Sequence, residues 1–184
     1  MEQAQLEIII EKCKQGDKLA FTKLISMFQK TVFSISFRLL CDEEDAKDVV
    51  QETFIKLWTN LNQYDASLKF STWLYSIASH ICLDKLKSFH HKNRQRIHAD
   101  EVRMREFISE ENTDVPLNNS ELREIIEIAT DSLSHKQKLL FTLRYLEELE
   151  IPEIEQITGM TANQIKSNLY LARKEIQNKL KKWL

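Results

Sequence analysis

The chain has 184 residues, enough for one sizeable hydrophobic core or for two small domains. It contains only two glycines and two prolines, although strands and tight turns use both residues freely. The composition therefore predicts an all-helical fold and disfavours a sheet-based one. The formal net charge of −2 says little as a total, because acidic and basic residues are concentrated in different segments.

Three cysteines, Cys13, Cys41 and Cys82, are widely spaced and lie among apolar residues. An odd number at such spacing does not indicate a disulfide framework and is typical of reduced thiols. Glutamate and glutamine precede the first apolar residues, and no segment is apolar for the length of a membrane span. We therefore expect a cytoplasmic protein without a signal peptide or a membrane anchor.

The beginning of the chain predicts two helices. A short one contains Leu6, Ile9, Ile10 and Cys13 on one face and ends at Gly16, a typical residue after a helix C-terminus. Asp17 can cap a second helix that runs to about Leu40. Its apolar face consists of Leu19 or Ala20 with Phe21, Leu24, Phe28, Val32, Ile35 and Leu39.

A third helix begins after Asp42, which can serve as its N-cap. Its apolar residues recur at three- and four-residue steps and must face a core: Ala46, Val49, Val50, Thr53, Phe54, Leu57 and Leu61. A second stripe on the outside is acidic and ends in an apolar residue: Asp48, Gln51, Glu52 and Ile55. From the residues alone, this stripe is either a solvated face or a partner site.

A fourth helix follows the turn-like residues 62–69 and carries a basic face. Its apolar positions include Leu74, Ile77, Ala78 and Ile81, with Trp73 and Leu86 added to them. On the polar side, Ser76, His80, Lys87, His91 and Arg94 follow one another at helical steps, with Lys85 and Lys92 beside them. Cations and nearby aromatic rings suit a nucleic-acid surface. The alternatives are a helix end stabilised by its dipole and a Trp73 that belongs to the core.

Residues 98–119 interrupt the helical pattern and indicate a linker, with one possible helical turn around residues 102–108. Apolar periodicity resumes at Ser120. Ser134 followed by Gln137 is the signature of a capping box at the start of a further helix.

The last part of the chain predicts a helix-turn-helix. A short helix from Pro152 to Thr158 is stopped by Gly159, and Thr161 with Gln164 caps a long final helix. Its outward side carries Asn163, Lys166, Ser167, Tyr170, Arg173 and Lys174, with Lys181 farther on. Such a helix can place its first turns on base edges in the major groove and its later cations on phosphates. The alternative is an ordinary helical hairpin with a basic end.

Three stretches resemble the extracytoplasmic-function sigma factors of bacterial RNA polymerase. DAKDVVQETFIKLW (45–58) is similar to the segment that docks on the clamp helices of the β′ subunit, and FSTWLYSIASHICLDKL (70–86) to the segment that captures the melted −10 element. Residues 133–180 resemble the domain that reads the −35 element. The resemblance implies sigma region 2 in residues 1–96, a linker in 97–119 and region 4 in 120–184.

The resemblance also implies partners. They are core polymerase, through the β′ clamp helices and the β flap, promoter DNA and an anti-sigma factor. The stripe of Asp48, Gln51, Glu52 and Ile55 becomes the expected polymerase face. The loop at residues 64–69 stands where the family holds a flipped base. The chain departs from the family at Ser79 and His80, where Arg-Asn is frequent, at Asn168 and Leu171, where a basic residue is frequent, and at Glu155, where a small alanine is usual.

Other classes of function find less support in the residues. A stand-alone helix-turn-helix activator would need a receiver or ligand domain rich in strands and glycine before its DNA-binding helices. An enzyme would need a phosphate loop, a Cys-x-x-Cys motif or a carboxylate pair with a base, and none of these occurs. His80 with Cys82, or His90 with His91, is too small a set to predict a metal, and we expect no metal or cofactor. A helical adaptor that binds only proteins stays open.

Overall fold

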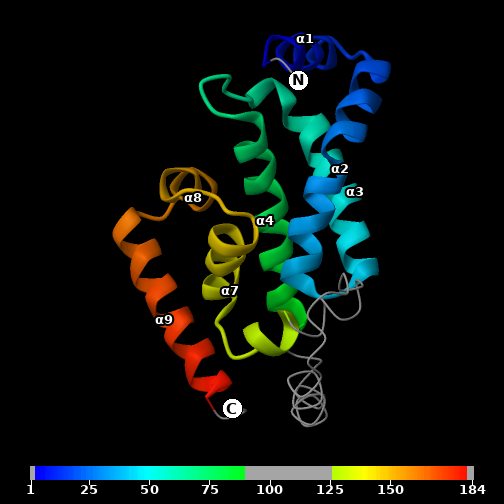
Figure 1. Cartoon of the computed structure of the whole chain (residues 1–184). Helices are drawn as coiled ribbons and strands as arrows, with labels where there is room; N and C mark the ends of the chain where they lie inside the picture. The colour runs from blue at the N-terminus through cyan, green and yellow to red at the C-terminus, as the bar shows by residue number, and fades with distance from the viewer. Residues whose placement is uncertain (1–2, 90–125, 182–184) are drawn as a thin grey trace, which may run out of the picture.

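The computed structural model describes residues 3–89 and 126–181, which fold into helices joined by short turns (Figure 1). The elements are α1 (Gln3–Lys14), α2 (Lys18–Leu40), α3 (Glu43–Asn60), η1 (Leu61–Gln63), α4 (Phe70–Phe89), α7 (His135–Phe141), η2 (Thr142–Leu146), α8 (Ile151–Thr158) and α9 (Ala162–Leu180). The predicted all-helical fold is confirmed. The predicted linker and the beginning of the helix expected at Ser120 lie outside the described residues.

The N-terminal half is built around the packing of α2, α3 and α4 on one another. Leu24, Ile35 and Leu39 of α2 are fully buried, as are Val49 and Leu57 of α3. Burying one aliphatic side chain of this size contributes about 1.5–3 kcal/mol, so this shared interior supplies much of the stability. At the beginning of α2, Ala20 faces the core and Leu19 does not, since Ala20 is 8% exposed and Leu19 83%.

The ends of these helices follow from local chemistry. Asp17 accepts hydrogen bonds from the backbone N–H groups of Leu19 and Ala20, and Asp42 accepts one from Asp45. Both aspartates therefore satisfy donors that have no partner inside the helix. Gly16 turns the chain between α1 and α2 with a φ of 87°, a conformation that glycine adopts without strain.

The C-terminal half begins with a short buried segment at residues 126–130 and continues through α7. The capping box of Ser134 and Gln137 at the start of α7 is present as predicted. The α-helix then widens into the π-helical turn η2, which the sequence pattern did not indicate. After it, α8 and α9 form the helix-turn-helix, with Gly159 at a φ of 68° between them.

The two halves are in direct contact, chiefly through α4 of the N-terminal half. On one side α4 packs against α2 and α3, and on the other against α7 and α8 (Figure 1). Helix α2 also contacts η2. The linker composition gave no reason to expect this contact.

Cys13, Cys41 and Cys82 are buried and form no disulfide. Burial raises the pKa of Cys82 to about 12, against the weaker opposing effects of Ser36 and Lys85. It also raises the pKa of Cys13. Thiols of this kind stay protonated and unreactive at neutral pH. No helix among the described residues is both long enough and apolar enough to cross a bilayer.

Candidate functional site

The outward face of α3 carries the four residues that the sequence predicted as a partner site. We call Asp48, Gln51, Glu52 and Ile55 the α3 patch. The structure places them on one side of the helix, opposite the buried Val49 and Leu57. Ile55 is 64% exposed. An acidic stripe that ends in an exposed apolar residue is suited to a protein partner.

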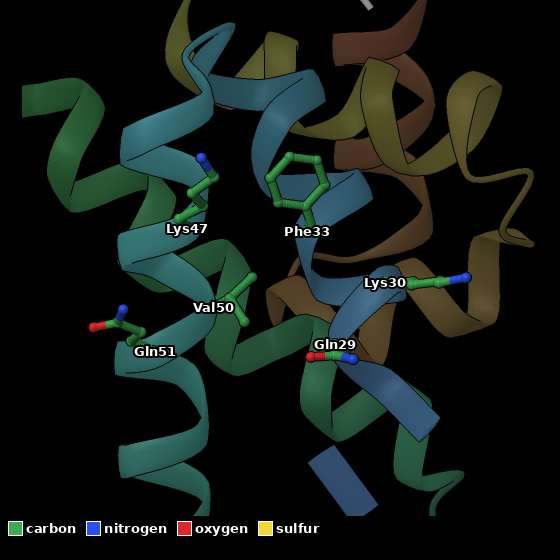
Figure 2. Close-up of a pocket in the computed structure, with 6 residues that line it drawn as sticks. All are labelled: Gln29, Lys30, Phe33, Lys47, Val50 and Gln51. Carbon is green, nitrogen blue, oxygen red and sulfur yellow. The ribbon is translucent and has the colours of Figure 1, made fainter. Parts of the chain in front are cut away.

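A groove runs beside the α3 patch, between α3 and α2. Its wider part has a volume of about 730 Å³ and is lined by Gln51 and Ile55 of the patch, with Phe21, Phe54 and Trp58 at its apolar floor. A second hollow of about 430 Å³ continues it toward the other end of α2. Figure 2 shows the residues of this hollow, with Val50 on α3 and Phe33 on α2 beside the space between the helices. The patch therefore borders an apolar surface that the sequence pattern did not reveal.

Asp48 is paired with a cation on another helix, whereas Glu52 pairs with Lys56 of α3 itself at 2.9 Å. Lys85 of α4 donates to Asp45 Oδ1 at 3.0 Å and to Asp48 Oδ2 at 3.3 Å. Burial alone would lower the pKa of Lys85, but these two hydrogen bonds outweigh it and raise the pKa. Lys85 thus fastens α4 to α3. The sequence pattern placed Lys85 beside the basic face of α4, but in the structure its ammonium group contacts α3.

The described part of the basic α4 face includes two of the predicted DNA-contacting residues. His80 and Lys87 are exposed, whereas His91 and Arg94 lie outside the described residues. His80 Nδ1 is 2.7 Å from the carbonyl oxygen of Ser76, and Lys87 donates to Asp84 at 2.9 Å. The contact with Lys87 holds the pKa of the Asp84 carboxyl below its usual value. Both side chains line a cavity of about 330 Å³ that α7 also borders.

The loop before α4 is held by aromatic packing. The ring of Tyr64 lies 5.3 Å from Phe70 and 5.2 Å from Trp73, measured between ring centroids. Tyr64 Oη donates to the carbonyl oxygen of Leu68 at 2.6 Å. Trp73 is half-buried in this cluster, as the core alternative expected. At the end of the loop, Lys69 forms an ion pair with Glu153 of α8 at 2.7 Å.

The outward face of α9 is the most regular polar surface of the described residues. All of the DNA-contacting residues predicted on this helix are exposed: Asn163, Lys166, Ser167, Tyr170, Arg173 and Lys174. On the opposite side Ile165, Leu169 and Ala172 are buried against the helices of the same half. Thr161 and Gln164 form the predicted capping box. The exposed Leu171, at 50%, adds an apolar residue to the outward side.

Glu155 has the partner that its position in the helix-turn-helix requires. Its Oε1 accepts a hydrogen bond of 2.6 Å from the backbone N–H of Ala162, the first residue of α9. The family pattern has a small alanine at this position and gives no indication of such a hydrogen bond. A glutamate side chain is long enough to span a three-residue turn, and this length could have identified the first N–H of α9 as its donor.

Glu147 links the C-terminal half to the N-terminal half. It stands directly after η2, and its carboxylate meets Arg38 of α2 and Tyr75 of α4. Arg38 also donates to the carbonyl oxygen of Leu146. Nothing in the sequence distinguishes Glu147, because the partners of Glu147 are far away along the chain and Glu147 belongs to no periodic face. Among the described residues, no group of three histidine, cysteine or acidic side chains is arranged to bind a metal ion.

Two family models match this chain. Residues 24–92 match the family model Sigma-70 region 2, and residues 123–176 match Sigma-70, region 4. The chain is 30% identical over 184 residues to the ECF RNA polymerase sigma-E factor of Haemophilus influenzae, with 97% of each chain covered. It is 26% identical over 181 residues to the ECF RNA polymerase sigma factor SigW of Bacillus subtilis, with 94% of this chain and 95% of the relative covered.

Solved structures show the same fold. CnrH in complex with the cytosolic domain of CnrY gives a TM-score of 0.67 at 18% identity, covering 95% of this chain and 96% of that one. The sigma factor RpoE of Bartonella quintana, in complex with the anti-sigma factor NepR, gives a TM-score of 0.62 at 18% identity. That match covers 88% of this chain and 96% of that one.

Proposed function

The chain belongs to the ECF family of RNA polymerase sigma factors, and from this premise we propose how its parts divide promoter recognition. As a sigma factor it acts in transcription initiation through sigma-70 regions 2 and 4 and is not an enzyme. We assign region 2 to residues 1–96, the linker to 97–119 and region 4 to 120–184. The site of action is the cytoplasm, where polymerase and promoter meet.

Core polymerase binds the α3 patch, in this proposal through the β′ clamp helices, and region 4 meets the β flap. An exposed isoleucine beside acidic side chains supports the first contact, because apolar centres within a polar rim are typical of protein interfaces. The groove beside Gln51 and Ile55 enlarges the surface that a partner helix can cover. Asp48 and Glu52 each have a cationic partner within the chain, Lys85 and Lys56, so a partner protein must compete with these ion pairs.

Region 2 contacts the −10 element with the basic side of α4, using His80 and Lys87 together with His91 and Arg94. Positive side chains at helical spacing support this, because phosphate contacts supply most of the affinity for DNA. The loop at residues 64–69 leads into α4, and its aromatic cluster is a suitable wall for an unstacked base.

Region 4 reads the −35 element with α9, and this assignment rests on one observation. The exposed face of Asn163, Lys166, Ser167, Tyr170, Arg173 and Lys174 stands opposite a buried apolar stripe on the second helix of a helix-turn-helix. The first turns of such a helix reach base edges in the major groove, and the cations farther along meet phosphates.

The two halves must separate before both elements can be read. Elements centred about 25 base pairs apart lie roughly 85 Å apart at about 3.4 Å per pair. Two packed domains of this size, each with a radius of gyration near 12 Å, have centres only about 30 Å apart. Residues 97–119 can reach roughly 75 Å when extended, at about 3.3 Å per residue. Polymerase docking therefore selects an open arrangement of the chain.

An anti-sigma factor can restrain the protein by favouring the closed arrangement or by covering the α3 patch. Support comes from the similar structures of CnrH with CnrY and of RpoE with NepR, which are complexes of such factors. For the present chain this partner is a proposal.

Run-off transcription with purified core polymerase tests the proposed function. Promoter affinity should be weak and strongly salt-dependent for the free protein, and tight and sequence-specific for the holoenzyme. Comparable, specific affinity without polymerase would contradict the proposal and favour the stand-alone activator.

A further inference from the structure

A carboxylate stands at the beginning of the DNA-reading helix. Glu155 lies on α8, across the turn from α9, and its Oε1 accepts the hydrogen bond of 2.6 Å from the N–H of Ala162. The backbone carbonyl of the same residue accepts the N–H of Gly159 at 2.8 Å. Glu155 therefore contacts the turn at both of its ends, and its side chain is only partly exposed.

The beginning of a helix attracts anions for two reasons. Its first N–H groups have no acceptor within the helix, and the aligned peptide dipoles place partial positive charge there. In DNA-binding helices these groups are available to a phosphate. In α9, Gln164 N–H donates to Thr161 Oγ1 at 3.4 Å, and Ala162 N–H donates to Glu155. The chain's own carboxylate thus stands in the position that suits a phosphate.

We propose that Glu155 is a positioning and specificity residue for DNA recognition. Its hydrogen bond fixes the start of α9 against α8, and its charge keeps a DNA phosphate away from the helix N-terminus. Binding then depends on the side chains of the outward face, above all Asn163 and Lys166, and less on sequence-independent phosphate contact. The inference rests on the proposed function of α9 as the −35 reader.

Three variants separate the two roles. Glu155→Gln removes the charge but keeps an acceptor oxygen, and Glu155→Ala removes both. Glu175→Gln, at an exposed glutamate farther along α9, is the matched control for the loss of one negative charge. Each variant is assembled with core polymerase. Its affinity is then measured over a salt series for the promoter and for the same promoter with a scrambled −35 element.

Glu155→Gln should bind both DNAs about threefold more tightly, the gain expected when a like charge about 6 Å from a phosphate is removed in water. Its salt dependence should steepen by up to about 0.9 in the logarithmic slope, the value for one further phosphate contact. Glu155→Ala should in addition lose discrimination between the two DNAs, because α9 is no longer fixed. Glu175→Gln should behave like the unaltered protein.

Amide hydrogen exchange of the free protein supplies a readout that needs no DNA. Exchange at Ala162 should accelerate about tenfold or more in Glu155→Ala, since a hydrogen bond to a charged group is lost, and much less in Glu155→Gln. Unchanged exchange in Glu155→Ala would overturn the inference.

The DNA measurements separate the remaining outcomes. If Glu155→Gln leaves affinity and salt slope unchanged while Lys166→Ala weakens promoter binding, the inference is wrong and the proposed function stands. If Lys166→Ala is also without effect, α9 is not the reader, and the specificity role of Glu155 fails with the proposed function.

Discussion

Arg38 of α2 and Glu147 of the C-terminal half form an ion pair with 2.8 Å between Nη1 and Oε1. Tyr75 Oη donates to the other oxygen, Oε2, at 2.8 Å, and Ser34 Oγ donates to Oε1 at 3.4 Å. The Glu147 side chain is only 8% exposed. Burial and the nearby carboxylate raise the pKa of Tyr75, so its hydroxyl remains a donor at neutral pH. Glu147 is thus a polar centre of the contact between the halves.

We predict that Glu147→Ala opens the free protein. The change leaves Arg38 and Tyr75 without their shared acceptor, and hydrogen bonds to a charged group contribute about 1.5–3 kcal/mol each. Small-angle X-ray scattering should therefore give a larger radius of gyration while circular dichroism reports unchanged helix content. The charge swap Arg38→Glu with Glu147→Arg should restore part of the compact state, and Glu175→Ala should have no effect. A compact Glu147→Ala protein would show that apolar packing alone holds the halves together.

A second prediction concerns the α3 patch. Glu52→Lys combined with Ile55→Glu should abolish binding to core polymerase. The double change reverses one charge and replaces the exposed apolar side chain by a carboxylate. The melting temperature should change little, since exposed substitutions typically alter stability by about 0.5 kcal/mol. Pull-down with core enzyme and thermal denaturation provide the two readings.

The control for this prediction is Glu44→Lys, a charge reversal on the same helix outside the patch, which should bind normally. Asp48 is left unaltered because its substitution would also disturb Lys85 and the contact between α3 and α4. Retained polymerase binding in the double variant would rule out the patch as the docking site.

The parts of this structure that the sequence predicted are those governed by neighbouring residues. Asp17, Asp42 and the pair of Thr161 and Gln164 cap helices through bonds that span two or three positions, so their spacing is legible in the chain. The buried and exposed faces of α3 and α9 follow in the same way from helical periodicity.

What the sequence did not predict depends on residues that are distant along the chain. Lys85 reaches Asp45 across 40 positions, and Glu147 reaches Arg38 across 109. The position of Lys85 or Glu147 in the sequence does not indicate such a distant partner. In addition, the π-helical turn before Glu147 breaks the α-helical periodicity from which a face could be predicted. The ion pairs of Lys85 and the contact between the halves were missed for this reason.

A third prediction concerns sequence discrimination by α9. Lys166→Ala or Tyr170→Ala should relax or abolish the preference at the −35 element, because these side chains project from the early turns of the helix. Lys181→Ala should instead weaken binding to all sequences alike and reduce the salt slope by about one. Selection of bound promoters from a randomised −35 library, with holoenzyme, measures both effects. The same preferred sequence from every variant would mean that another surface reads this element.

The last prediction is that mild acid weakens the contact between the halves through Glu153. Lys69 and the backbone N–H of Glu150 both donate to this carboxylate and hold the pKa of Glu153 below its usual value. A carboxyl with a lowered pKa in the closed state stabilises that state above its ordinary pKa, near 4.5, and the stabilisation is lost as the pH falls through the lowered value. The closed state should therefore loosen below about pH 4.5 and not between pH 6 and about 8.

Fluorescence energy transfer between one dye in each half measures this loosening, and Glu153→Gln identifies its source. The variant cannot lose a charge in acid, so its transfer efficiency should already be reduced at neutral pH and should change less between about pH 6 and 4. Glu147 and Arg38 remain in both proteins, so the contribution of their ion pair is common to the two measurements. Helix content, followed in parallel, separates opening of the halves from acid unfolding. If both proteins lose transfer equally with pH, the ion pair of Lys69 and Glu153 does not control the closed state.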